Sequence, residues 1–180
     1  MKKHTLIILG GNSPKNKDWI KEMNKYLKWD YSTVEFFYSH REEKFEDINF
    51  EKEIKKLSKV IKDSEISTYS IVAKSAGFML SLQGVAGNLL TPSAIVWYGL
   101  PIEYSTYRKI DLKPLLEIAS KKTHIICVQA EEDPQGNVNQ VEDLVSGIIP
   151  ILSIKDNTHN YDQFKQMANS AKNFIATHQS

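Results

Sequence analysis

Short apolar runs alternate with amphipathic segments along the whole chain, and this alternation restricts the fold more than any other feature. Runs of strand length occupy residues 5–9, 33–38, 70–72, 94–98, 124–129 and 149–154. Between them, apolar residues recur at helical spacing, as in Trp19, Ile20, Met23 and Leu27. Short, mostly apolar strands separated by helices are typical of a parallel sheet covered on both faces. The sequence therefore predicts a three-layer α/β sandwich.

Length favours one domain, and the charge argues against two classes of partner. The chain has 180 residues, of which 41% are hydrophobic, so it can bury one substantial core. No repeat, low-complexity segment or linker divides it, and we expect a single domain over residues 1–180. The formal net charge of +1 argues against nucleic acid or a membrane surface as partner, because both favour a strong basic excess.

The chain offers few signs of a cofactor or of export. Its one cysteine, Cys127, lies in an apolar run, so neither a disulfide framework nor a zinc site is expected. The apolar run after Met1 is too short for a signal peptide, and no run approaches the ~18 residues of a membrane span. We expect a cytoplasmic protein that needs no metal or cofactor.

Residues 69–82 join a strand pattern to an apolar helix pattern through a group of small residues. Ser75 is at the junction, with Ala73 two residues before it and Gly77 two residues after. A sharp strand-to-helix turn of this kind exposes a serine hydroxyl in the nucleophile elbow, whose usual pattern is Gly-x-Ser-x-Gly. Ala73 departs from that pattern. Ser75 alone would equally fit a helix N-cap.

Two further polar residues follow later strands. Asp133 comes after the fifth predicted strand and His159 after the sixth. Ligands bind beyond the carboxyl ends of the strands of such a sheet. A serine hydroxyl needs a neutral imidazole to take its proton, and the imidazole needs a carboxylate to fix its tautomer. Taken singly, Asp133 before Pro134 also reads as a turn, and His159 as a surface-loop residue.

Other residues compete for the acid and base roles. Glu131 and Glu132 adjoin Asp133, and Asp156 precedes the histidine loop. We favour Asp133 because a proline follows it and it is further from its strand. His40 follows a strand, but one predicted at the sheet edge. The remaining histidines precede strands or lie near the chain end, where a base is not expected: His4, His124 and His178.

These motifs together resemble the α/β-hydrolase superfamily of serine hydrolases. Residues 73–77 resemble its elbow, 131–134 its acid loop, 157–159 its histidine loop, and 9–12 its oxyanion loop. The resemblance covers nearly the whole chain and implies a six-stranded parallel sheet in the order 2-1-3-4-5-6. It implies Ser75 as nucleophile, Asp133 as acid and His159 as base.

The resemblance also implies an oxyanion hole made of backbone N–H groups. One belongs to Ala76 at the start of the helix after the elbow, where the helix dipole favours negative charge. The second belongs to Asn12 or to Gly11. Gly10 stands where many members of the superfamily have histidine. Because of this departure, the sequence does not define which residue of the oxyanion loop is the second donor.

The segment after the fourth predicted strand, residues 99–110, is too short for a deep lid. We expect it to line a shallow pocket with Leu100, Ile102, Tyr104 and Tyr107. Lys74 and Arg108 would favour an anionic substrate or be solvated surface charges. The predicted activity is hydrolysis of a small or short-chain carboxylic ester, or a thioester, through an acyl-enzyme.

Two other classes of function stay open. One is a non-catalytic binding protein on the same scaffold, suggested by the departure at Ala73. The other is a nucleotide-binding protein that uses residues 10–13 at a helix N-terminus. That segment lacks the lysine and the spacing of a P-loop. Neither the substrate nor the oligomeric state follows from the sequence.

Overall fold

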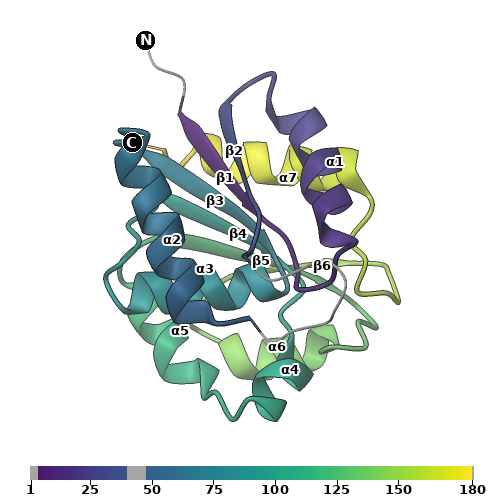
Figure 1. Ribbon diagram of the computed structural model, residues 1–180. Coiled ribbons are helices and arrows are strands. Elements are labelled where there is room, and N and C mark those ends of the chain that lie inside the picture. The colour runs from purple at the N-terminus through teal and green to yellow at the C-terminus, as the bar shows by residue number, and fades with distance from the viewer. Residues whose placement is uncertain (1–3, 40–47, 180) are drawn as a thin grey trace.

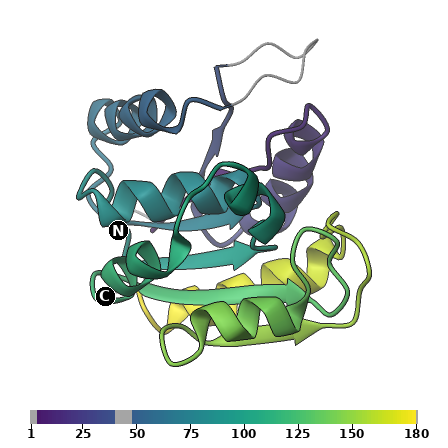
Figure 2. The same ribbon diagram turned by 90° about the horizontal axis from the view of Figure 1, so that it is seen from below.

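A computed structural model describes residues 4–39 and 48–179 and contains one six-stranded sheet. All neighbouring strands are parallel, in the order β2-β1-β3-β4-β5-β6, which confirms the predicted fold class. Figure 2 shows the strand arrows pointing toward one edge of the sheet. The strands are β1 (Thr5–Leu9), β2 (Ser32–Phe36), β3 (Tyr69–Lys74), β4 (Ala94–Tyr98), β5 (His124–Ala130) and β6 (Ile151–Ile154).

Helices cover both faces of the sheet. On one face α1 (Asn16–Leu27) packs beside α7 (Phe164–Ala176) (Figure 1). On the other face lie α2 (Phe50–Asp63), α3 (Ala76–Ala86), α5 (Leu112–Ser120) and α6 (Val138–Val145). A short helix, α4 (Ile102–Tyr107), follows β4.

The sheet separates two hydrophobic clusters. Ile71 and Ala73 of β3 face the cluster under α2, α3 and α5, whereas Val72 between them faces the cluster under α1 and α7. All six residues of β3 are buried, as expected for a central strand covered on both sides. The elbow at the end of β3 is therefore supported by a strand that is enclosed on both faces.

The elements differ from the sequence prediction at a few ends. The second strand stops at Phe36 rather than at residue 38, and the sixth begins at Ile151 because Pro150 before it has no N–H to donate to the sheet. The helical spacing of apolar residues after the sixth strand predicts a last helix that includes Tyr161, but this helix begins at Phe164 and leaves Tyr161 in the preceding loop. Within residues 99–110 the chain forms α4, which the sequence analysis did not predict.

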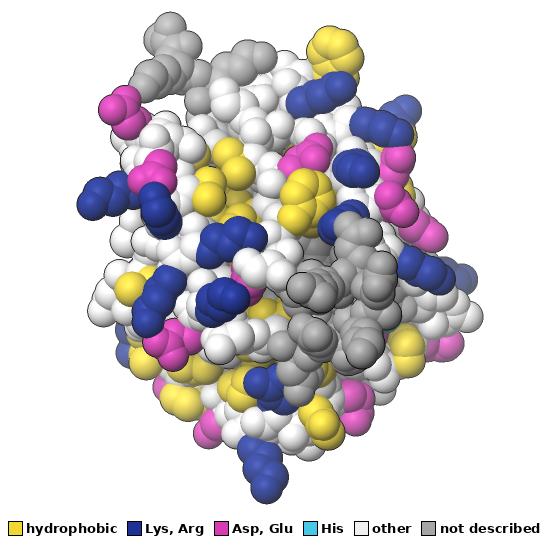
Figure 3. All heavy atoms as spheres, in the orientation of Figure 1, with side chains coloured by type: hydrophobic (Ala, Val, Ile, Leu, Met, Phe, Trp, Pro, Cys, Tyr) yellow, Lys and Arg dark blue, Asp and Glu magenta, His cyan; other side chains and the backbone are white. Residues whose placement is uncertain are grey.

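Charged side chains of both signs are interspersed on the face shown in Figure 3, in keeping with the small net charge. No helix in the described part of the chain is long and apolar enough to cross a membrane. His40, one of the histidines considered above, lies outside the described residues.

Candidate active site

The turn between β3 and α3 consists of one residue. Lys74 is the last residue of β3, Ala76 the first of α3, and Ser75 connects them with φ 53° and ψ −110°. A residue with a side chain rarely adopts this conformation, and such strain is concentrated at functional sites. The Ser75 N–H donates to the Tyr98 carbonyl oxygen at 3.1 Å. The Ser75 side chain makes no capping hydrogen bond, so the N-cap alternative does not describe this residue.

Gly77 allows α3 to lie directly against β1. A Cβ atom at this position would come within 2.7 Å of Leu9 Cβ and 2.8 Å of the Leu9 carbonyl oxygen. The Gly77 N–H donates to the Gly10 carbonyl oxygen at 3.0 Å, and that oxygen also accepts from the Tyr38 hydroxyl at 2.6 Å. The second glycine of the elbow pattern is therefore required by packing, and it links the elbow to the loop after β1.

The loops after β5 and β6 bring Asp133 and His159 together. His159 Nδ1 lies 2.9 Å from Asp133 Oδ1 and 2.8 Å from Oδ2. Asp133 is only 2% exposed. Glu131 and Glu132 are exposed, and the side chain of Asp156 instead accepts the N–H groups of Asn157 and Thr158. Among the competing carboxylates, Asp133 is the one paired with the histidine.

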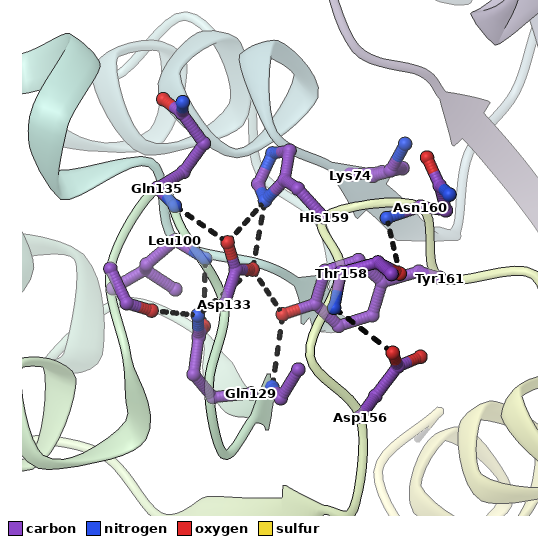
Figure 4. Close-up of polar contacts among 12 residues, drawn as sticks. Lys74, Leu100, Gln129, Asp133, Gln135, Asp156, Thr158, His159, Asn160 and Tyr161 are labelled. Carbon is purple, nitrogen blue, oxygen red and sulfur yellow. Dashed lines mark hydrogen bonds and ion pairs between the residues drawn. The ribbon is translucent and has the colours of Figure 1, made fainter.

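Three further donors hold the Asp133 carboxylate (Figure 4). The Gln135 N–H donates to Oδ1 at 2.8 Å, while the Tyr161 hydroxyl and Gln129 Nε2 donate to Oδ2 at 2.7 and 3.2 Å. Burial of the phenol, reinforced by the Asp133 charge, raises the pKa of Tyr161. The tyrosine therefore remains a hydrogen-bond donor, and the carboxylate is held with its oxygens toward the imidazole.

Gly99, directly after β4, makes room for the histidine loop. It has φ +69°, and a Cβ atom there would lie 2.5 Å from Tyr161 Cε2 and 2.9 Å from His159 Cε1. The two rings meet edge to face with their centroids 5.8 Å apart. The His159 ring is thus fixed between β4 and Tyr161.

Ser75 and His159 line one cavity of about 370 Å³. His159 Nε2 is buried and has no hydrogen-bond partner among the described residues; in Figure 4 it points away from Asp133. The serine–imidazole hydrogen bond is thus not formed in this structure. Such bonds are often long in unliganded sites and close in the substrate complex.

The same cavity brings together four more of the residues selected from the sequence, namely Ala76, Asn12, Lys74 and Tyr104. The Ala76 N–H lies in the first turn of α3, so no carbonyl oxygen within the helix accepts a hydrogen bond from it. Gly11 does not line this cavity but a smaller one beside it.

The remaining residues of the predicted pocket lie elsewhere. Leu100 is fully buried, Ile102 packs over Gly136, and Tyr107 is 74% exposed. None of the three lines the cavity that holds Ser75. Arg108 Nη1 donates to the Tyr104 hydroxyl at 3.1 Å. Leu100 precedes α4 and packs in the core, whereas Ile102 and Tyr107 lie on α4, which turns its side chains in different directions.

Lys74 is buried and directly precedes Ser75 in the chain. Its Nζ donates to Asn16 Oδ1 at 3.3 Å and lies 6.0 Å from the centre of the Trp19 ring. Burial lowers the pKa of Lys74 to about 8, and the negative charges of Asp133 and Asp162 oppose part of this shift. Lys74 is therefore a cavity residue rather than a solvated surface charge.

Sequence reasoning missed several residues of the site. Gln129 interrupts an otherwise apolar strand, Gly99 directly follows a strand, and Tyr161 comes two residues after His159. A polar side chain inside a buried strand needs partners, so Gln129 carried a usable signal. Nothing in the sequence indicated that Asn16 would contact Lys74. In the described residues, no group of three or more histidine, cysteine, aspartate or glutamate side chains is arranged to hold a metal ion.

Comparison with solved structures identifies the architecture. Est1E from Butyrivibrio proteoclasticus, solved with ferulic acid bound, matches over 98% of this chain and 90% of its own, with TM-score 0.78 and 13% identity. The Pyrococcus furiosus esterase Pf2001 matches over 99% and 84%, with TM-score 0.74 and 16% identity. A lipase-esterase related protein from Clostridium acetobutylicum matches over 97% and 95%, with TM-score 0.68 and 16% identity.

No protein-family model and no curated protein sequence matches the chain. The structural similarity nevertheless extends over nearly all of this chain and most of each esterase. It agrees with the strand order of the sheet. The chain therefore has the fold of the α/β-hydrolase superfamily.

Proposed function

We propose that the protein is a serine hydrolase that cleaves a small or short-chain carboxylic ester, or a thioester, through an acyl-enzyme. The observation that carries this proposal is the pairing of buried Asp133 with His159 Nδ1, in a ring that shares a cavity with Ser75. The strained backbone of Ser75 supports it, because the strain holds the hydroxyl at the corner of the elbow. The esterases with the same fold support the general class.

The proposed mechanism assigns one step to each side chain. His159 Nε2 takes the proton of the Ser75 hydroxyl as Ser75 Oγ attacks the carbonyl carbon, and the imidazolium then protonates the leaving group. Asp133 keeps the Nδ1–H tautomer and stabilises the imidazolium. Water activated by the same imidazole then releases the acid.

The proposed oxyanion hole uses the backbone N–H groups of Ala76 and Asn12. Both residues line the cavity, whereas Gly11 does not, and this favours Asn12 as the second donor. Each donor contributes about 3 kcal/mol of transition-state stabilisation in comparable sites. The cavity volume of about 370 Å³ is near the lower end for small-molecule sites, which agrees with a small substrate.

The proposal is tested with Ser75→Ala and a short-chain aryl ester such as 4-nitrophenyl acetate. We expect kcat to fall at least about a thousandfold, because the nucleophile is lost while the fold is kept. Ser170→Ala, on a half-buried position of α7 that does not line the cavity, is the matched control. Equal turnover by wild type and Ser75→Ala would show that Ser75 is not the nucleophile.

A non-catalytic binding protein is the second candidate, and the unformed hydrogen bond at His159 Nε2 is the observation that favours it. A fluorophosphonate probe separates the two functions. Labelling of the Ser75 peptide, read by mass spectrometry and absent in Ser75→Ala, supports the hydrolase. A folded protein that is neither labelled nor active would support the binding protein.

A further inference from the structure

Lys74 is the one buried lysine among those that the structure describes, with 7% of its surface exposed. It lines the cavity together with Ser75 and His159. The mechanism above uses neither its charge nor its protons. A buried ammonium without a role in the fold or the reaction calls for another explanation, because its desolvation is costly.

Beyond the Trp19 ring, the described residues give Lys74 little compensation for its lost hydration. An ammonium group has three N–H donors, and one of them reaches Asn16 Oδ1 at 3.3 Å. No carboxylate in the described part of the chain lies within 4 Å of Nζ. Asp133, which is bound to His159, and Asp162 act on it only from a greater distance.

Asn16 holds the ammonium in place but leaves it incompletely paired. Its Nδ2 donates to the carbonyl and hydroxyl oxygens of Ser13, both at 3.2 Å. These bonds orient Oδ1 toward Lys74, at the beginning of α1. The lysine is therefore positioned by a neutral acceptor, with donors remaining at the wall of a cavity that is large enough for a small ligand.

We propose that Lys74, positioned by Asn16, binds a carboxylate of the substrate, so that the enzyme acts on small esters that carry a carboxylate close to the scissile bond. This inference rests on the proposed function of Ser75. A carboxylate fits because it accepts two hydrogen bonds from an ammonium and neutralises it. The adjacency of residues 74 and 75 requires the substrate charge to be near the reacting carbonyl group.

The experiment compares anionic and neutral esters of matched shape. One pair carries the charge on the alcohol side, 4-acetoxybenzoate against its methyl ester. The other carries it on the acyl side, monoethyl succinate against ethyl butyrate. We expect the anionic ester to have the higher kcat/KM in at least one pair. In Lys74→Met that preference should fall by about 10- to 100-fold, the range for a hydrogen bond to a charged group. Lys113→Met, an exposed position on α5, is the control.

The pH dependence gives a second readout that needs no variant. The pKa of Lys74 is about 8, so the preference for the anionic ester should fall as the pH rises from 7 to 9. Asp133 and Asp162 favour the charged form, and His159 and Tyr104 are the other titratable side chains of the cavity. Titration of these other groups changes kcat/KM for both esters of a pair. Taking the ratio of the two kcat/KM values removes the part of that change that the two esters share.

Failure of the inference is distinguishable from failure of the proposed function. The carboxylate subsite would be overturned if the neutral ester of each pair were cleaved as well as the anionic one and Lys74→Met left the anionic-to-neutral ratio of kcat/KM unchanged. That result would leave the proposed hydrolysis by Ser75 standing. If no ester is cleaved, titration calorimetry with 4-acetoxybenzoate decides. If the wild type binds 4-acetoxybenzoate and Lys74→Met does not, the carboxylate subsite is supported even without hydrolysis. If the wild type does not bind it, the subsite is overturned.

Discussion

Replacement of Lys74 by methionine should stabilise the protein at neutral pH. In the unfolded chain the lysine has an ordinary pKa of about 10.5, whereas burial lowers it to about 8 in the folded protein. Below pH 8 both states carry the charge, and the folded state bears the full desolvation cost. Between pH 8 and 10.5 the unfolded state binds more protons, so the contribution of this group to stability improves as the pH rises.

The size of the effect follows from the two pKa values. At about 1.4 kcal/mol for each tenfold change in proton affinity, the charge costs roughly 3 kcal/mol at pH 7. Methionine is of similar length and removes the charge, but it also loses the hydrogen bond to Asn16 and the contact with Trp19. We therefore expect Lys74→Met to raise the free energy of unfolding by about 1–3 kcal/mol.

The assay is urea denaturation of wild type and Lys74→Met at several pH values between 7 and 10. The difference between the two proteins isolates Lys74 from other groups, including tyrosines such as Tyr98 and Tyr161, whose pKa values are raised by burial. The difference should be largest near pH 7 and shrink toward pH 10. A variant that is less stable than wild type at pH 7, or a difference that does not change with pH, would refute the reasoning.

The remaining predictions concern the acid and the elbow. Tyr161→Phe removes a donor to Asp133 and the acceptor of the Ala130 N–H, so we expect a loss of about 1–3 kcal/mol in urea denaturation and a lower kcat with KM little changed. A wild-type kcat in this variant would contradict a positioning role. Gly77→Ala forces a Cβ against Leu9 and should cost about 1–3 kcal/mol. Gly87→Ala, where the added atom meets a single carbonyl oxygen at 3.1 Å, should cost clearly less; equal costs would show that contact with β1 is not the cause.

The α/β architecture was readable from the sequence because it depends on local patterns. A strand that is covered on both faces is mostly apolar, and β3 to β5 show this in their central residues, 71–73, 94–98 and 125–128. Chain order then places the residues that follow each strand at one edge of a parallel sheet. This is why Ser75, Asp133 and His159 could be selected without coordinates, although the strand order itself came from the resemblance to a known fold.

Contacts between distant segments could be found only in the tertiary structure. The choice of Asp133 over Glu131 and Glu132 depended on which carboxylate the β5 loop buries against His159. The exclusion of Ile102 and Tyr107 from the cavity depended on the turn of α4, and that of Leu100 on its packing in the core.

The sequence by itself determined the layered fold and the order of the serine, aspartate and histidine, because periodicity and chain order are local properties. The tertiary structure alone decided what surrounds them. It placed the Tyr161 hydroxyl and the Gln129 amide against the Asp133 carboxylate. It also buried Lys74 against Asn16, 58 residues away in the chain. The physical reason is that burial and hydrogen-bond partners depend on which segments pack together, and residue type does not specify that.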